Sequence, residues 1–272
     1  SVSWGLEMAY EDWCISQIAA KAGLDSLAQA YAAKGEYYKR YLDPETKMMR
    51  PIMSDGSFRT PFNPRYSAHM RSDYTEGNAF QWSFFAPHDM DNFIATIGGK
   101  KELETRLDTL FTTSSQVDGE HASGDITGLI GQYAHGNEPS HHMAYLYNWT
   151  DSPWKGQERL DYIMSEFYTN KPDGIGNEDC GQMSAWYVMS ALGFYQVAPG
   201  IPVYTLGRPM VDRALIHVKG GIFEIVVKNN SPENKYIRTV TLNGKELETP
   251  FFSHAEMAKG GKLVFEMTNT HP

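Results

Sequence analysis

Residues 176–200 read GNEDCGQMSAWYVMSALGFYQVAPG and contain the point at which the chain changes its character. The run from 180 to 193 is almost wholly apolar and has helical spacing, so it predicts a buried helix. After VAPG at 197–200 the sequence becomes β-branched and aromatic with an alternating pattern, which is typical of strands. This stretch therefore predicts an α+β protein, with a mainly helical domain at 1–198 and a β-strand region at 199–272.

Apolar residues recur at helix spacing through most of the first part of the chain. About eight helices in consecutive pairs predict part of an (α/α)6 toroid, although a full ring of six helical hairpins needs twelve. The chain is therefore expected to be a fragment of a longer protein. The expected helices cover residues 4–23, 25–42, 78–98, 99–112, 124–133, 139–148, 154–168 and 180–193.

Five or six strands are expected after residue 200, in an antiparallel β region. Asn243-Gly244 is a hairpin turn signal, and the glycine pairs at 220–221 and 260–261 are similar breaks. Earlier in the chain, residues 43–77 form a long connection rich in Pro, Gly, Ser and Arg. A loop of that length inside a compact domain is usually functional or disordered. Its aromatic residues and arginines favour a functional loop.

The composition limits the partners of the protein. The formal net charge is −9 and no basic stripe is present, which argues against nucleic acid and suits a neutral or cationic ligand or a metal cation. The sequence contains no apolar run of about 18 residues, so it predicts no membrane-spanning helix. Two cysteines, Cys14 and Cys180, indicate no disulfide framework and no zinc site, although a single bridge between them is possible.

Acidic side chains precede aromatic helices at three places, in EGN at 76–78, GNE at 136–138 and GNED at 176–179. Taken singly, each acid could simply stabilise a helix N-terminus, and Asp179 with Gln182 resembles a capping box. If successive helical hairpins line a ring, however, these helix starts face one end of it. The acids would then converge on one pocket, and we expect a single site.

The same stretches resemble the family 92 glycoside hydrolases, which are calcium-dependent, exo-acting α-mannosidases. The resemblance covers about residues 1–212, with family-like strands after it. It implies a β-sandwich before the toroid, with the active site between them. That missing sandwich is an expected partner, and the chain alone is expected to be a poor catalyst or inactive. The resemblance rests on TEGNAFQWSFFAPHD (75–89), YAHGNEPSHHMAYLYNW (133–149), PWKGQ (153–157) and GIGNEDCGQMSAWYVMSALGFYQVAPG (174–200).

The resemblance implies hydrolysis of terminal, non-reducing α-mannosyl residues from N-glycan-type or other mannosides with inversion. Inverting enzymes need a general acid and a general base on opposite faces of the sugar. Glu76 matches the general acid of the family and Asp179 matches its base. Mannose-containing glycans are thus the expected partners. The residues expected to contact them are Trp154, Gln157, Asn177, Asn137 and His141, with core packing as the alternative for Trp154.

Calcium in this family contacts the mannose hydroxyls, and the resemblance implies a Ca²⁺ cofactor here. Glu138 is the first choice of ligand, and Asn78 and Gln81 are weaker choices. The Asn-Glu pair at 137–138 does not specify the linkage, and the protein is expected to be periplasmic, cell-surface or secreted. A non-catalytic carbohydrate-binding or scaffold module, with the acids serving as helix caps, is the alternative function.

Overall fold

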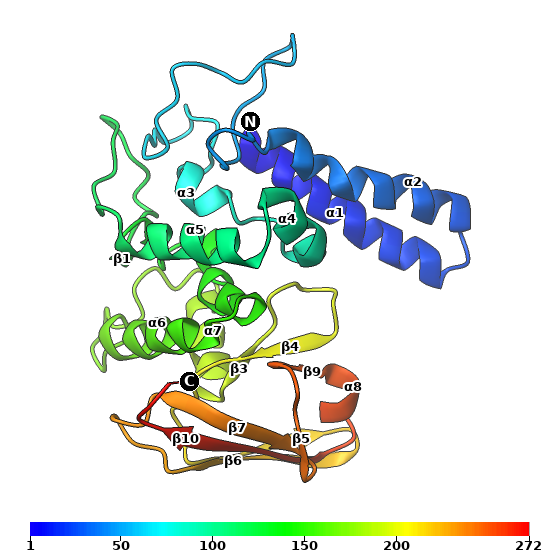
Figure 1. Cartoon of the computed structure of the whole chain (residues 1–272), viewed down its shortest axis with the longest axis vertical. Helices are drawn as coiled ribbons and strands as arrows, with labels where there is room; N and C mark the ends of the chain where they lie inside the picture. Colours follow the sequence, from blue (N-terminus) through cyan, green and yellow to red (C-terminus); the bar gives the residue numbers. More distant parts are fainter. Residues whose placement is uncertain (272) are drawn as a thin grey trace. The chain divides into compact units, whose positions relative to one another are not determined.

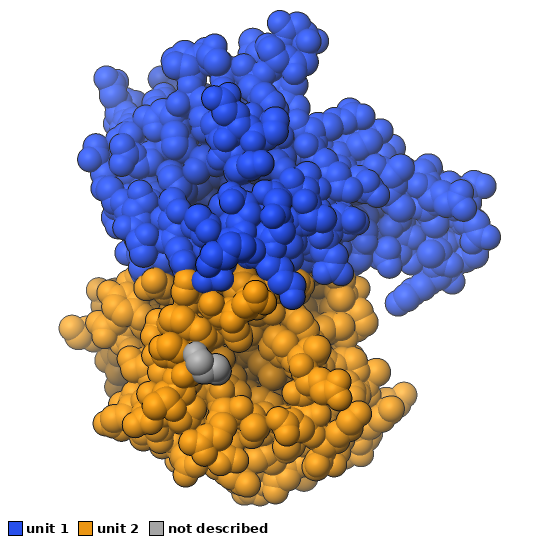
Figure 2. Space-filling view, in the orientation of Figure 1, with its two compact units in different colours: residues 1–140 blue, residues 141–272 orange. Residues whose placement is uncertain are grey.

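The computed structural model describes residues 1–271, and the chain forms two compact units, Ser1–Ser140 and His141–Pro272 (Figures 1 and 2). Helix accounts for 38% of the structure and strand for 18%, so the predicted α+β class with helix predominating is confirmed. The change from helix to strand near residue 198 lies inside the second unit. That unit therefore contains helices as well as the C-terminal sheet region.

A helical hairpin opens the first unit (Figure 1). Helices α1 (Val2–Lys21) and α2 (Asp25–Gly35) lie side by side, and a 3₁₀ turn η1 (Glu36–Tyr41) follows. Helix α5 (Lys100–Thr112) confirms the helix expected at 99–112.

The single helix expected at 78–98 is wrong. The structure has a short α3 (Ala79–Trp82), a 3₁₀ turn η2 (Pro87–Asp89) and α4 (Met90–Ile97) in its place. Pro87 explains the break, because proline has no backbone N–H to continue a helical hydrogen-bond ladder.

The helix expected at 124–133 is also wrong. The strands β1 (Leu129–Ile130) and β2 (Tyr133–Ala134) pair there as a small antiparallel hairpin. Gly131 has a φ of 61°, and a Cβ at that position would lie 2.3 Å from the carbonyl oxygen of Leu110. The backbone therefore passes too close to α5 for any other residue, and apolar periodicity does not reveal this contact.

The second unit begins with helices that pack against its sheets. The stretch expected as an α-helix at 139–148 forms the 3₁₀ segments η3 (Glu138–Ser140), which ends the first unit, and η4 (Met143–Trp149). Helices α6 (Pro153–Glu166) and α7 (Gln182–Ala191) confirm the helices expected at 154–168 and 180–193.

Two sheets follow α7 (Figure 1). A three-stranded sheet has the order β3-β4-β9, and a five-stranded sheet has the order β5-β6-β10-β7-β8. All pairs are antiparallel except β6 with β10, which is parallel. The elements are β3 (Phe194–Tyr195), β4 (Val203–Leu206), β5 (Arg213–Val218), β6 (Gly221–Lys228), β7 (Tyr236–Leu242), β8 (Lys245–Glu246), β9 (Phe251–Ser253), α8 (His254–Met257) and β10 (Gly261–Thr268).

The alternating strand pattern builds one apolar core in this unit. Phe223 of β6, Leu263 and Phe265 of β10 and Phe252 of β9 are almost fully buried in it. The rings of Phe223 and Phe252 stack with centroids 6.1 Å apart, which joins the two sheets. The predicted turn at Asn243-Gly244 is present, with both residues at positive φ between β7 and β8.

Two expectations about single features have clear outcomes. Cys14 and Cys180 are both free thiols, so the possible bridge between them is not formed. Within residues 1–271, the structure contains no helix that is both long and apolar enough to cross a membrane.

Candidate functional site

Glu76 lies at the surface just before α3, and it does not cap that helix. Its backbone is left-handed, with a φ of 49°, which is uncommon for a residue with a side chain. The cap is Asn78, whose side chain accepts a hydrogen bond from the backbone N–H of Phe80 at 3.0 Å. In the part of the chain that the structure describes, no hydrogen bond or ion pair engages the Glu76 carboxylate. This carboxylate is therefore exposed and available to a ligand.

The negative charge of Glu76 affects the pKa of another acid, Glu7 on α1. Burial, and then the negative charges of Glu11 and Glu76, raise the pKa of Glu7. Like charges disfavour each other's ionised form, so the neighbouring acids favour a bound proton on Glu7.

A hydrogen bond joins the first two acidic motifs within the first unit. The side-chain amide of Asn137 donates a hydrogen bond of 2.9 Å to the backbone carbonyl of Glu76. This bond joins residues 61 positions apart and holds the Asn137–Glu138 segment against the segment that carries the candidate acid. Glu138 itself begins η3 and is half-buried.

Asn78 and Gln81, the weaker calcium candidates, belong to a buried amide network. The Gln81 side-chain oxygen accepts from the Asn78 backbone N–H at 2.7 Å, which completes a capping box. The Asn78 amide donates to the side chain of Gln132 at 2.8 Å, and the Gln81 amide donates to the Gln132 carbonyl at 2.6 Å. These contacts give both side chains a structural role beneath Glu76.

Asp179 repeats the geometry of Glu76 in the second unit. It is exposed, its φ is 47°, and its carboxylate has no hydrogen bond or ion pair with any described residue. The capping box expected between Asp179 and Gln182 is wrong, because α7 has Gly181 at its N-cap and no side-chain cap. The neighbouring Glu178 is held instead by the Ser184 hydroxyl, which donates to its carboxylate at 3.0 Å.

His141 is buried beside the start of α7. Its Nδ1 lies 3.1 Å from the Gln182 amide nitrogen, and its backbone carbonyl accepts a 2.9 Å hydrogen bond from the Trp186 indole. These contacts fix the His141 ring against α7. Asn177, the third polar candidate of this region, is exposed in the loop before Glu178.

Trp154 and Gln157 lie on α6 and contact the C-terminal strand region. The Gln157 side-chain oxygen accepts a 2.9 Å hydrogen bond from the backbone N–H of Ile237 in β7. The Trp154 indole stacks on the His271 ring, with centroids 4.0 Å apart. These contacts favour the packing interpretation of Trp154, and a sugar-contacting role for either residue stays a prediction.

A metal ion would need oxygen donors here. Across residues 1–271 the structure contains no cluster of three or more His, Cys, Asp or Glu side chains that could hold a metal. Calcium nevertheless accepts amide and backbone carbonyl oxygens besides carboxylates. Glu138 and the side-chain oxygen of Asn137 are donors of this type on one segment. The chemistry of these donors fits Ca²⁺. Because Ca²⁺ takes six to eight oxygen ligands, backbone carbonyls or water molecules would have to supply the others.

The structure also contains a hollow that no motif predicted. It lies in the first unit and has Tyr66, His69, Arg71, Glu120 and His121 in its lining. The signal in the sequence was the arginine-rich and aromatic loop at 43–77, which supplies three of these five residues. The partner segment near residue 120 carried no signal of its own.

The comparisons with known proteins agree on one family. The model of the glycosyl hydrolase family 92 catalytic domain matches residues 1–269. A family 92 α-mannosidase from Bacteroides thetaiotaomicron, solved with mannoimidazole, is 39% identical with a TM-score of 0.93, over 99% of this chain and 36% of that chain. An inverting family 92 mannosidase from the same organism is 33% identical with a TM-score of 0.85, over 99% of this chain and 37% of that chain.

A curated relative points the same way. A protein of Arthroderma benhamiae described as an uncharacterized secreted glycosidase is 27% identical over 290 residues, which cover 97% of this chain and 35% of the relative. The chain thus spans about a third of the length of these relatives. The family 92 mannosidases have an α/α toroid, so the predicted partial toroid is confirmed for the helical part. Sequence and fold together place the chain in glycosyl hydrolase family 92, as part of its catalytic domain.

Proposed function

We propose that this chain is the part of an inverting, exo-acting α-mannosidase that carries both catalytic acids. The reaction is hydrolysis of a terminal α-mannosyl residue from an N-glycan-type or related mannoside. In the intact protein an N-terminal β-sandwich completes the site. The names of the structural relatives, α-mannosidase and inverting mannosidase, support the bond and the stereochemistry.

One observation supports the catalytic pair above the others. Glu76 and Asp179 are both exposed non-glycine residues with left-handed backbones, at φ values of 49° and 47°. Such a conformation costs on the order of 1–3 kcal/mol, and it persists only where the surrounding structure enforces it. Neither carboxylate is engaged by another described residue. Two strained positions that each present an unengaged acid are the expected setting for chemistry on a ligand.

The roles follow from the requirements of inversion. One carboxyl group must protonate the leaving oxygen, and the other must take a proton from a water molecule on the opposite face. Glu76 supplies the proton, because its exposed carboxyl group is not engaged by any other described residue. Asp179 acts as the base. The Asn137 amide holds the Glu76 backbone and thereby orients the acid.

A calcium ion would be held by Glu138 and Asn137, together with backbone or water oxygens. When bound, it would coordinate sugar hydroxyls and favour a distorted ring. Glu138 and Asn137 would serve mainly to position the sugar relative to Glu76. A secreted or cell-surface location, periplasmic in a bacterium, suits a glycan substrate, and the name of the Arthroderma relative supports it.

Proton NMR of the reaction tests this function directly. The intact protein should be incubated with methyl α-mannoside or an α-mannobiose, and the anomeric signals followed from the first minutes. An inverting enzyme releases β-mannose first, and the α-anomer appears later by mutarotation. Initial release of α-mannose would show a retaining reaction and remove Asp179 as base. No hydrolysis of any α-mannoside would favour the non-catalytic binding module.

A further inference from the structure

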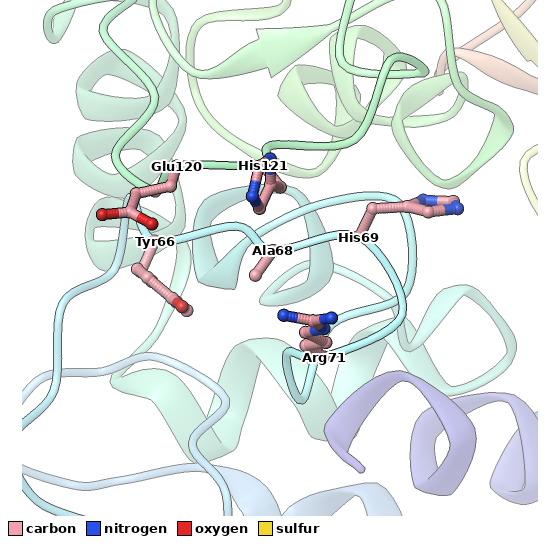
Figure 3. Close-up of a pocket in the computed structure, with 7 residues that line it drawn as sticks. Tyr66, Ala68, His69, Arg71, Glu120 and His121 are labelled. Carbon is pink, nitrogen blue, oxygen red and sulfur yellow. The ribbon is translucent and has the colours of Figure 1, made fainter.

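Two adjoining hollows lie in the first unit, on residues 51–74 and, for the first hollow, also on residues 119–121. The first has a volume of about 500 Å³ and is the one shown in Figure 3. The second, of about 330 Å³, includes Phe62, Asp73 and Tyr74 in its lining. Tyr66 and Arg71 line both. The two hollows are therefore parts of one groove, with these two side chains at the junction.

The groove is built on paired backbone segments. The backbone N–H groups of Ser67 and His69 donate 2.8 Å hydrogen bonds to the carbonyls of Asp118 and His121. Gly119 makes this pairing possible, because a Cβ there would lie 2.1 Å from the Ser67 carbonyl oxygen, and its φ is 127°. A close approach that only glycine permits indicates a fixed wall.

The second hollow has a similarly anchored wall. The Tyr74 hydroxyl donates a 2.6 Å hydrogen bond to the Met49 carbonyl, and Tyr74 is buried. The guanidinium of Arg50 lies over the Phe62 ring, 4.6 Å from its centroid, and Arg50 is itself paired with Asp43. The aromatic side chains of this hollow are thus held in place before any ligand arrives.

Arg71 supplies a positive charge at the junction. No described residue forms an ion pair or a side-chain hydrogen bond with its guanidinium, whereas Arg59 in the second hollow is paired with Asp73 at 2.5 Å. Figure 3 shows Glu120 beside Tyr66 at one end of the first hollow, with Arg71 and His121 on either side of Ala68. Arg71 is exposed, and a guanidinium of this kind can form charge-assisted hydrogen bonds to a carboxylate or a phosphate, although Glu120 also lines the hollow.

The groove also lies close to the candidate acid. Asp73 precedes Glu76 by three positions, so their Cα atoms are at most roughly 11 Å apart. A general acid acts on the oxygen of the leaving group, and a groove next to it can receive the sugar that leaves. Tyr66, with 47% of its surface exposed, presents a ring to such a sugar.

We propose that this groove binds the leaving-group saccharide and that Arg71 selects one bearing an acidic group, a carboxylate or a phosphate. The guanidinium forms two parallel hydrogen bonds to either oxyanion, and these are stronger than bonds between neutral groups. Tyr66 and the aromatic wall contact the sugar ring. The inference rests on the proposed mannosidase function, because it assigns the groove to the departing part of the substrate.

The test compares four substrates of the intact enzyme. Three are disaccharides with the same non-reducing α-mannose, and their leaving sugars are neutral, a uronic acid or a sugar phosphate. The fourth, an aryl α-mannoside, has no leaving sugar and reports the proposed function alone. Wild-type kcat/KM should be highest for at least one acidic disaccharide. Arg71→Gln should lower kcat/KM for that acidic disaccharide about tenfold or more, as expected for loss of a charged hydrogen bond. For the neutral disaccharide and the aryl mannoside, the same substitution should lower kcat/KM less than about twofold.

Arg40→Gln is the matched control, because Arg40 is an exposed arginine of the same unit outside the groove. A preference for only the uronic acid or only the phosphate supports the proposal and identifies the group. Equal rates on neutral and acidic disaccharides, or an equal loss on all substrates in Arg71→Gln, would overturn it. Inorganic phosphate that competes as well as the free sugar phosphate would also overturn it, because the sugar would then contribute nothing. Inactivity on every substrate, the aryl mannoside included, would refute the proposed function and with it this inference.

Discussion

Replacing Asn78 with alanine separates the structural role of this residue from a role in metal binding. Asn78 is fully buried, with 0% of its surface exposed. The substitution removes the cap on the Phe80 N–H and the donor to the Gln132 side chain. Loss of an N-cap costs about 1 kcal/mol, and a buried acceptor left without a donor costs about 1–3 kcal/mol. We therefore expect the free energy of unfolding to fall by about 2–4 kcal/mol.

Thermal unfolding followed by circular dichroism measures this change. For a protein of this size, a loss of about 3 kcal/mol lowers Tm by roughly 6–12 °C. The fall should be the same in Ca²⁺ and in EGTA, because none of the broken hydrogen bonds involves a metal. Asn92→Ala is the matched control, since Asn92 is exposed on α4 and makes one side-chain hydrogen bond to Asp89. It should change stability by less than about 0.5 kcal/mol. A fall in Tm that occurs only with Ca²⁺ would show that Asn78 is a ligand, and the structural account would be wrong.

Three further predictions concern catalysis, metal and acid stability. Glu76→Gln and Asp179→Asn should each lower kcat at least about a hundredfold. Only Glu76→Gln should retain activity on substrates with a good leaving group. Wild-type turnover in Asp179→Asn would exclude Asp179 as the base. EGTA should abolish the activity, and added Ca²⁺ should restore it. Glu138→Ala should raise the Ca²⁺ concentration needed to restore the activity. Full activity after exhaustive chelation would contradict a role for calcium. Asp43→Asn should destabilise the protein by about 3–5 kcal/mol at pH 7, because it leaves Arg50 buried without its partner. Burial alone would raise the pKa of Asp43, but hydrogen bonds, including that from Arg50, outweigh it and lower the pKa from 3.8 to about 2. The advantage of the wild type is therefore complete above pH 4 and declines as the pH falls toward 2; urea titrations that show the same difference at pH 7 and pH 2 would contradict the assignment.

The sequence predicted the elements whose stability comes from a repeated local pattern. Helices α1, α5, α6 and α7 follow apolar spacing, and the C-terminal strands follow alternation, so both could be recognised one segment at a time. The errors arose where a tertiary contact decides the backbone. Gly131 must pass against the Leu110 carbonyl, and no local pattern records the position of that carbonyl. The parallel pairing of β6 with β10 also depends on distant residues.

The candidate site shows the same limit. The acidic motifs were visible in the sequence, and the expected ring of helical hairpins predicted that their acids converge. The Asn137 hydrogen bond to the Glu76 carbonyl joins two of these motifs within the first unit. Which side chain caps each helix was not visible, because Asn78 and Asp179 both precede an apolar helix and both could accept its N–H groups. The structure assigns the cap to Asn78 at α3 and to no side chain at α7. At α3 the Asn78 amide is held by Gln132, which lies 54 positions later in the sequence, and no local pattern records that contact.

The position of β10 in its sheet has a consequence for how the second unit is made. β10 is the last of the five strands in the sequence, yet it lies between β6 and β7 at the centre of the sheet. Translation proceeds at roughly 5–20 residues per second. Until residues 261–268 leave the ribosome, the β5–β6 and β7–β8 hairpins each retain an unpaired edge and an uncovered apolar face. Such edges pair readily with other chains. The nascent protein is therefore most vulnerable to aggregation just before β10 is complete, and a chaperone that binds extended apolar segments would act in that interval.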